Sequence, residues 1–249
     1  MEIEKVIFAF IFGTVFGSFF NVVIYRVPNS ISIVKPSSHC PICKRTLKWY
    51  HNIPLVSYIF LGGKCAYCGA KIPFSYFLIE LFTGIIFSFL FLKDGFTITY
   101  FSNLFVFSIL LIQAAIDFKY MEVPSILNDL LLVGGIFYLI KNYSLNYMLF
   151  SLFVSIAFLI LYFFYRKKIG FGDVKIFIAL SMFFNYDLIY IILISSLLGI
   201  SFALVFSLVK KVKFSSIKLP FVPYILFGVV AYWIILYITK TSALMNLSI

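Results

Sequence analysis

Two aspartates in this sequence stand where a hydrolytic site could form. Asp173 comes directly after Gly170-Phe171-Gly172 and opens one apolar segment, and Asp117 closes another apolar segment in LLIQAAIDFKYMEVPSIL. An ionisable residue at the edge of a membrane segment is costly to keep and is a functional candidate by default. We therefore take Asp117 and Asp173 as candidate catalytic residues.

Their chemistry follows if the two side chains lie close together. Two carboxylates a few Å apart cannot both ionise at neutral pH, so one of them holds a proton. The ionised member can take a proton from water while the protonated member polarises a carbonyl, as in aspartic proteases. Gly170 and Gly172 allow a tight backbone approach and leave room for an extended peptide. The alternative is that Asp173 only caps a helix and Asp117 is an interfacial charge.

A second set of residues has the spacing of a metal site. All four cysteines occur in two C-x-x-C pairs, CPIC and CAYC, within one polar stretch. Such pairs are typical of a structural zinc site with four thiolate ligands: Cys40, Cys43, Cys65 and Cys68. Loss of the metal and redox chemistry are alternatives. His39 and His51 flank the pairs, as substitute ligands or as solvated loop residues.

The surrounding elements are expected to be membrane helices. The chain has 249 residues, of which 63% are hydrophobic and 12% charged, with a mean hydropathy of +1.09, which excludes an ordinary soluble domain. Apolar runs near the length of a bilayer crossing predict an all-α polytopic membrane protein with about eight spans. These lie at roughly 6–25, 74–92, 98–116, 124–140, 146–165, 174–184, 188–209 and 220–239.

The polar stretch divides the chain into three expected parts. Residues 1–25 form a first transmembrane helix that is retained, not cleaved; residues 26–73 form a small zinc-binding domain; and residues 74–249 form the membrane core. Most of the 20 basic residues fall in alternate loops, around 26–73, 117–123, 166–175 and 210–219, which predicts that these loops are cytoplasmic. The net charge of +11 is then explained by topology and anionic lipid, with no nucleic acid partner.

Several motifs in a fixed order give the chain a family resemblance. They cover nearly its whole length: GSFFNVVIYRVP, CPIC, WYHNIPLVSY, GGKCAYCGAKI, IELFTG, AAIDFKYMEVP, GFGDVK and LPFVPYILFG. In these motifs the chain resembles the type IV prepilin peptidases, bacterial membrane aspartyl proteases of the G-x-G-D class. It departs from their usual pattern at Ser125 after Pro124, at His51 and at Gly63.

The resemblance implies a function and a location. Asp117 and Asp173 would be the catalytic pair, supported by Gly170 and Gly172, that cuts the basic leader from prepilin or pseudopilin precursors. The cut would occur at the cytoplasmic face of the bacterial inner membrane.

The resemblance also implies a second activity, N-methylation of the new amino terminus from S-adenosylmethionine. Gly17, Asn21, Arg26 and Glu80 match family positions and are the candidates for binding the methyl donor. Close helix packing for Gly17, and polar or orienting roles for Asn21 and Arg26, are the alternatives.

Two other classes of protein would explain part of the sequence. A secondary transporter also carries intramembrane carboxylates, but it should show two similar halves and charges near the middle of the membrane. A non-enzymatic zinc scaffold would explain the cysteines and the positive loops. It predicts that Asp173→Asn leaves function intact.

Overall fold

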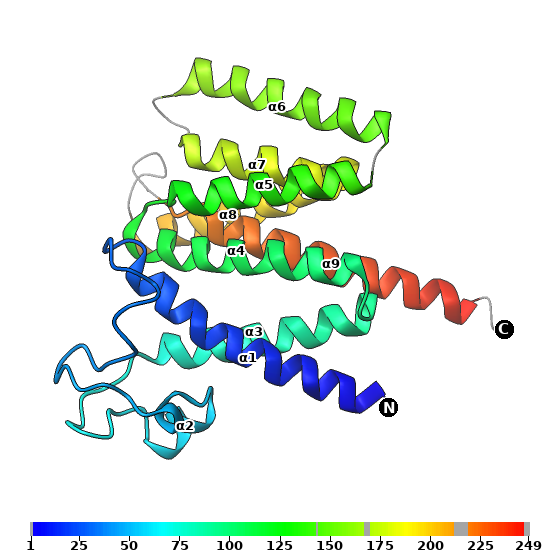
Figure 1. Cartoon of the computed structure of the whole chain (residues 1–249). Helices are drawn as coiled ribbons and strands as arrows, with labels where there is room; N and C mark the ends of the chain where they lie inside the picture. The colour runs from blue at the N-terminus through cyan, green and yellow to red at the C-terminus, as the bar shows by residue number, and fades with distance from the viewer. Residues whose placement is uncertain (1, 143, 167–169, 212–218, 247–249) are drawn as a thin grey trace. The chain divides into compact units, whose positions relative to one another are not determined.

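The chain is helical throughout the residues that the structure describes. The computed structural model describes residues 2–142, 144–166, 170–211 and 219–246, and in these it contains helices and no strand (Figure 1). Two compact units, Met1–Ser108 and Ile109–Ile249, divide the chain. Residues 167–169 and 212–218, in two of the loops used for the predicted orientation, lie outside the described residues.

Small residues bring two long helices of the first unit together. Helix α1 (Glu2–Arg26) and helix α3 (Phe74–Asp94) pack side by side (Figure 1). A Cβ on Gly13 would lie 2.8 Å from the Cα of Gly84, so nothing larger than glycine fits there without a shift. Because lipid offers apolar groups no hydrophobic reason to associate, such close backbone packing is the usual way that membrane helices bind one another.

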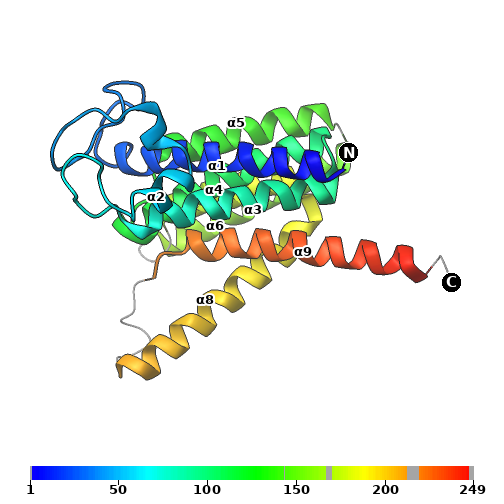
Figure 2. The ribbon, with the colours of Figure 1, turned by 90° about the horizontal axis from the view of Figure 1, so that it is seen from below.

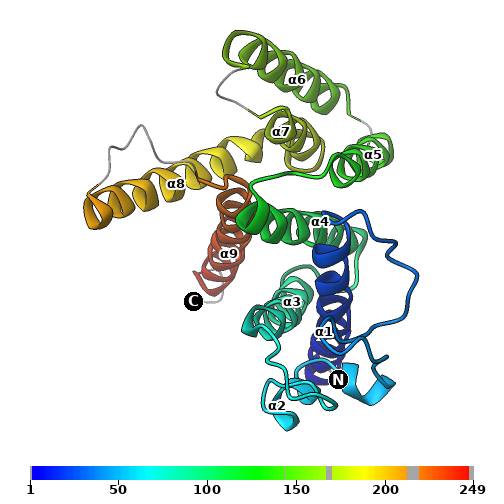
Figure 3. The ribbon, with the colours of Figure 1, turned by 90° about the vertical axis from the view of Figure 1, so that its left-hand side faces the viewer.

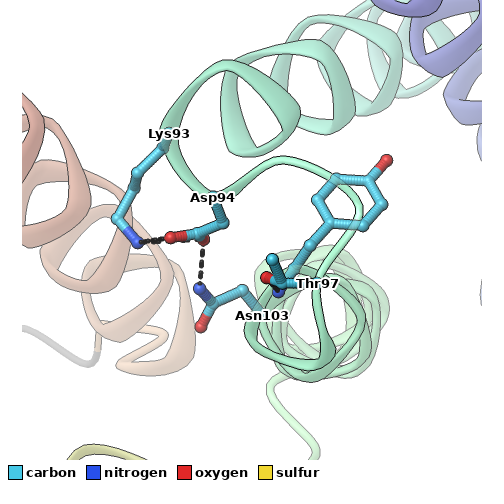
Figure 4. A network of polar contacts seen from close by, with 5 residues as sticks. Lys93, Asp94, Thr97 and Asn103 are labelled. Atoms are coloured by element: carbon cyan, nitrogen blue, oxygen red, sulfur yellow. Dashed lines mark hydrogen bonds and ion pairs between the residues drawn. The ribbon is translucent and has the colours of Figure 1, made fainter.

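A short turn joins α3 to α4 (Ile98–Tyr120), and its polar groups are paired. The ammonium of Lys93 lies 2.8 Å from the carboxylate of Asp94, to which Asn103 donates a hydrogen bond of 2.9 Å (Figure 4). The Thr97 hydroxyl accepts a hydrogen bond from the Tyr100 N–H at the start of α4. The carboxylate of Asp94 therefore has a structural explanation.

The polar stretch with the cysteines lies between α1 and α3 in the sequence. It contains a short 3-10 helix, η1 (Trp49–Asn52), and one short helix, α2 (Val56–Phe60). Two isolated bridges, His39 with Thr46 and Lys64 with Lys71, each close one hairpin turn. These turns hold the cysteine pairs.

The second unit is organised around α7. Helices α5 and α6 both pack on α7, as Figure 3 shows, and α8 packs with α9 (Figure 2). Val174, Ile176, Ala179 and Leu180 of α7 are almost completely buried. Asp173, the residue that follows Gly170-Phe171-Gly172, therefore lies in the first turn of a well-buried helix. Its helices are α5 (Ser125–Lys141), α6 (Leu145–Tyr165), α7 (Phe171–Phe184), η2 (Asn185–Asp187), α8 (Leu188–Lys210) and α9 (Val222–Asn246).

The helices confirm the all-α polytopic fold but correct the number of spans. Each of the eight expected segments coincides with a helix, yet only six segments of the described chain are long and apolar enough to cross a membrane. Helix α5, with 17 residues, is short of that length. Helices α7 and α8 count together as one apolar segment of 40 residues, Phe171–Lys210, because only the 3-10 turn η2 separates them.

Candidate functional site

The two candidate aspartates line one cavity in the second unit. Asp117 lies in the last turn of α4, and Asp173 is the third residue of α7. The cavity has a volume of about 330 Å³ and collects residues from three separate stretches of the chain. It is lined by Asp117, Met121, Val123, Gly170, Gly172, Asp173, Leu219 and Phe221.

The two glycines lie so close to neighbouring atoms that a side chain at either position would be crowded. Gly170 is the residue before α7, and a Cβ there would lie 3.3 Å from the Oδ2 atom of Asp173. A Cβ on Gly172 would lie 3.1 Å from the Cβ of Val123. Both distances are tighter than ordinary van der Waals contact, so a side chain at either position would press on the cavity wall or on the aspartate itself.

One of the two carboxylates accepts a hydrogen bond from the main chain. Asp117 is 6% exposed, and its Oδ2 atom accepts a hydrogen bond of 3.0 Å from the main-chain N–H of Val222. The carboxylates of Asp117 and Asp173 are close enough to interact electrostatically. Two interacting carboxylates in one partly buried cavity favour the state in which a single proton is shared between them.

Behind the cavity lies an amide pair that the sequence reasoning missed. The Nε2 atom of Gln113, one turn before Asp117 on α4, donates a hydrogen bond of 2.8 Å to Oδ1 of Asn128 on α5. Both side chains are buried, and the Nδ2 atom of Asn128 faces Gly172. A glutamine inside an apolar span was the signal that could have revealed this pair.

An ion pair joins α5 to α7 close to the cavity. The ammonium of Lys175 lies 2.8 Å from the carboxylate of Asp129. Lys175 is two residues after Asp173, and Asp129 follows Asn128. Asp129, although it lies inside an expected span, thus has a partner and is not among the residues that line the cavity.

The four cysteines come together in the first unit. Their sulfur atoms all lie within 4.8 Å of one another, and the Sγ atoms of Cys40 and Cys68 are 3.9 Å apart. Tetrahedral zinc with Zn–S bonds of about 2.3 Å requires sulfur atoms roughly 3.8 Å apart. The cluster therefore fits zinc, with Cys40, Cys43, Cys65 and Cys68 as its ligands.

The two cysteine turns repeat the same backbone design. The N–H of Lys44 donates to the carbonyl of Cys40 at 2.9 Å, and the N–H of Gly69 donates to that of Cys65 at 3.0 Å. Lys44 and Gly69 both have the left-handed backbone conformation, with φ of 61° and 70°. The backbone N–H of Cys43 helps to hold the pKa of the Cys40 thiol at about 6, which favours its thiolate. The main chain of Ala70 lowers the pKa of Cys68, but burial and hydrogen bonds with the other thiols outweigh it and raise that pKa to about 11.

The histidines next to the cysteines are outside this cluster. Within the described residues, the ligand atoms that gather at one point belong to the four cysteines. The Nδ1 atom of His39 is 3.0 Å from the carbonyl of Ser37, and the ring of His51 lies between those of Tyr50 and Tyr67. The structure thus gives both histidines local contacts.

Three of the methyl-donor candidates meet where α1 and α3 pack together. A Cβ on Gly17 would lie 2.7 Å from the Cα of Glu80, so the backbone of α3 fills the space beside this glycine. The Oε2 atom of Glu80 accepts a hydrogen bond of 2.8 Å from the N–H of Leu55. The Nδ2 atom of Asn21 donates to the carbonyl of Tyr76 at 3.0 Å, while its buried Oδ1 atom has no partner among the described residues.

The fourth candidate, Arg26, is 5% exposed. Its side chain is hydrogen-bonded to the segment that follows α1. Its guanidinium donates to the carbonyls of Ser32 at 2.9 Å and Pro36 at 2.7 Å. Gly17 and Glu80 are likewise engaged in packing and hydrogen bonding within the first unit. Their assignment to a methyl donor stays a prediction.

Two family models match the chain in succession. The model of the bacterial peptidase A24 N-terminal domain matches residues 11–93, which include the four cysteines. The model of the type IV leader peptidase family matches residues 104–204, which include Asp117 and Asp173. No solved structure gives a significant match.

Individual relatives carry one recurring name. The chain is 34% identical over 217 residues to a "prepilin leader peptidase/N-methyltransferase" of Vibrio cholerae, an alignment that covers 80% of this chain and 85% of the relative. A protein of the same name from Myxococcus xanthus is 42% identical over 118 residues, but only 35% of that longer relative is covered. One from Pseudomonas aeruginosa is 29% identical over 259 residues, covering 90% of this chain and 87% of the relative.

Proposed function

Because the chain belongs to the type IV leader peptidase family, we propose that it cuts the leader from prepilin or pseudopilin precursors. The observation that carries this proposal is the common cavity of Asp117 and Asp173, with Gly170 and Gly172 in its wall. The printed names of the relatives support the substrate class.

The chemistry is that of an aspartyl dyad. One carboxylate removes a proton from a water molecule, and the other donates a proton to the oxygen of the scissile carbonyl. A side chain at Gly170 would press on the carboxylate of Asp173 and one at Gly172 on Val123, so glycine at both positions keeps the aspartates unobstructed for a substrate. Hydrolysis requires water at the aspartates, so the cavity should open toward the aqueous side of the membrane.

The location follows from the helix ends. Asp117 is in the last turn of α4 and Asp173 in the first turn of α7, which puts the reaction near an edge of the membrane. The loops on this side are rich in lysine and arginine, so we assign this edge to the cytoplasmic face of the bacterial inner membrane. The substrate's hydrophobic segment would lie among the helices while its basic leader stays in the cytoplasm.

The cysteine cluster has a structural role in this proposal. Zinc held by four thiolates has no open coordination position, so it takes no direct part in hydrolysis. Its contribution is to fold the segment between α1 and α3. A chelator that abolished cleavage while leaving this segment folded would contradict the structural assignment.

A second activity is N-methylation of the new amino terminus. The names of the relatives, which combine leader peptidase and N-methyltransferase, are the specific observation that favours it. S-adenosylmethionine would supply the methyl group. A mass increase of one methyl group on the cleaved product, dependent on added S-adenosylmethionine, would establish this activity.

The test is cleavage of a prepilin-like precursor by the purified protein, followed by mass spectrometry of the product. Asp117→Asn and Asp173→Asn preserve size but remove the groups that exchange protons. We expect each to lose cleavage by a factor of about 10³ or more. Asp129→Asn is the matched control, because this carboxylate is on α5 outside the cavity.

Each outcome has a defined meaning if zinc content and helix content are unchanged. Loss of cleavage in both cavity variants, but not in the control, supports the dyad. Full cleavage by either cavity variant would rule out the aspartyl mechanism.

A further inference from the structure

A main-chain group from a distant helix reaches one of the two aspartates. The N–H of Val222, the first residue of α9, donates to Oδ2 of Asp117 at 3.0 Å, and this bond is buried. Val222 itself is 0% exposed. Leu219 and Phe221, just before α9, line the same cavity. The start of α9 is therefore part of the wall that surrounds Asp117.

The N–H of Val222 is free to make this bond because of its place in the helix. The first N–H groups of a helix have no partner within the helix, and they carry the positive end of its dipole. The intrahelical bonds of α9 begin later, where the N–H groups of Tyr224 and Ile225 donate to the carbonyl of Phe221. A carboxylate that accepts such a bond is stabilised in its ionised form.

The other aspartate is placed differently. Within the part of the chain that the structure describes, the carboxylate of Asp173 has no hydrogen bond from the main chain of another element. Among the described residues that line the cavity, the titratable side chains are those of Asp117 and Asp173. The bond from Val222, together with the adjacent main chain of Phe221, thus distinguishes Asp117 from Asp173.

We propose that the N–H of Val222 holds Asp117 in its ionised form and thereby fixes which aspartate is the base. This inference rests on the proposed peptidase function. Asp117 takes a proton from the attacking water as the water oxygen bonds to the scissile carbonyl carbon. Asp173 gives its proton to the carbonyl oxygen, which yields a tetrahedral diol.

The diol then breaks down with the proton movements reversed. The proton on Asp117 passes to the leaving nitrogen as the C–N bond breaks, and one diol hydroxyl returns its proton to Asp173. The products are a carboxyl group and a new amino terminus, and both aspartates regain their starting states. Val222 acts through its main chain only, so it is a positioning residue.

The test replaces the donor without removing the helix. Val222→Pro deletes the N–H, and proline is well tolerated at the first position of a helix. Val222→Ala is the matched control, because it truncates the side chain and keeps the N–H. The measurement is kcat/KM for cleavage of a synthetic prepilin-like peptide as a function of pH, which reports on groups of the free enzyme.

The direction of the expected shift follows from the loss of the hydrogen bond between Val222 and Asp117. Losing the donor makes ionised Asp117 less stable, so more alkaline conditions are needed to ionise the base. In Val222→Pro the acid limb of the profile should move to higher pH by about one unit, and kcat/KM on that limb should fall about 10-fold. In Val222→Ala the acid limb should stay where it is in the unmodified protein, whatever the truncation does to stability.

Two results would overturn the assignment. One is an acid limb in Val222→Pro that coincides with that of Val222→Ala. The other comes from infrared difference spectra of the full-length protein, which do not depend on whether the proline variant folds. We expect Asp173→Asn to lose the band of a protonated carboxyl group and Asp117→Asn to lose that of an ionised carboxylate; the reverse pattern would exclude Asp117 as the base.

Failure of the role of Val222 can be distinguished from failure of the proposed peptidase function. If both asparagine variants cleave the precursor normally, the dyad is wrong and the bond from Val222 has only a structural role. If both are inactive and the acid limb does not move, the dyad stands and only the role of Val222 fails.

Discussion

The cysteine cluster and the aspartate cavity are assembled in different ways. The cluster is local, because all its ligands lie between Cys40 and Cys68 on two turns with the same hydrogen bonds. The cavity draws on the end of α4, the start of α7 and the residues just before α9. A metal ion can gather the first site with little help from the rest of the chain, whereas the second exists only when several helices pack correctly.

The largest effect should follow from removing a ligand of the cluster. Cys65→Ser should abolish stoichiometric metal binding and leave the segment between α1 and α3 open to limited proteolysis. A structural zinc site contributes on the order of 10 kcal/mol or more to the folding of small domains. Metal content by mass spectrometry and the rate of proteolysis are the measurements.

The control for this variant tests the neighbouring histidine. His39→Ala should keep one metal ion per chain, because His39 is outside the group of ligand atoms. Metal loss in His39→Ala, or full metal content in Cys65→Ser, would contradict a site made of four cysteines.

Within the cavity, the most damaging substitution should be one that adds a side chain where neighbouring atoms are closest. Gly172→Ala places a Cβ 3.1 Å from Val123, so α7 or the chain around Val123 must shift. We expect a loss of about 1–3 kcal/mol in stability, typical of overpacking, and a fall in cleavage of roughly 10-fold or more, as a displaced catalytic group produces. Thermal unfolding and cleavage rates measured on the same preparation would separate the two effects.

A second helical glycine provides the comparison. Gly199 in α8 has only ordinary contacts, the nearest at 3.6 Å from Tyr224, so Gly199→Ala should leave cleavage unchanged. Equal losses in both variants would mean that glycine matters for helix flexibility in general, not for the shape of the cavity.

This contrast also explains what could be predicted from the sequence. Four cysteines in two identical spacings identify their own ligand set, and the structure brings these four sulfur atoms together. The aspartates were recognisable because carboxylates are rare in an apolar chain. The donor at Val222 was not, since a main-chain N–H carries no signal in residue type and lies 105 residues away in sequence from Asp117.

The helices were predicted better than their number of crossings. Apolar runs gave the position of every long helix, but hydropathy could not decide whether α7 and α8 cross separately, because the turn between them is only three residues long. The domain boundaries at residues 25/26 and 73/74 stay predictions. For Gly17 and Arg26 the sequence left packing and orienting roles open, and their contacts are of this structural kind.

A smaller effect should come from the buried amide pair behind the cavity. Gln113→Leu leaves Oδ1 of Asn128 without its 2.8 Å hydrogen bond. Interhelical hydrogen bonds in membrane proteins contribute about 0.6 kcal/mol on average and up to about 1.7. We expect a loss in this range. The double variant with Asn128→Leu should recover part of it, which a double-mutant cycle of unfolding free energies would reveal.

The smallest effect should come from the ion pair between α5 and α7. The side chains of Lys175 and Asp129 are 24% and 58% exposed, so neither charge is left fully buried when its partner is removed. Lys175→Met should therefore cost at most about 1 kcal/mol, the upper range for exposed ion pairs, and the metal content should not change.

The pair at the α3 to α4 turn provides the opposite case. Lys93 and Asp94 are 12% and 13% exposed, and Asn103 also bonds to the carboxylate. Asp94→Asn leaves a largely buried ammonium without its partner, so it should destabilise the protein more than Lys175→Met does. If Lys175→Met were the more damaging of the two, the exposed pair would be essential to the position of α7. The start of α7, and with it Asp173, would then depend on Lys175 as much as on glycine packing.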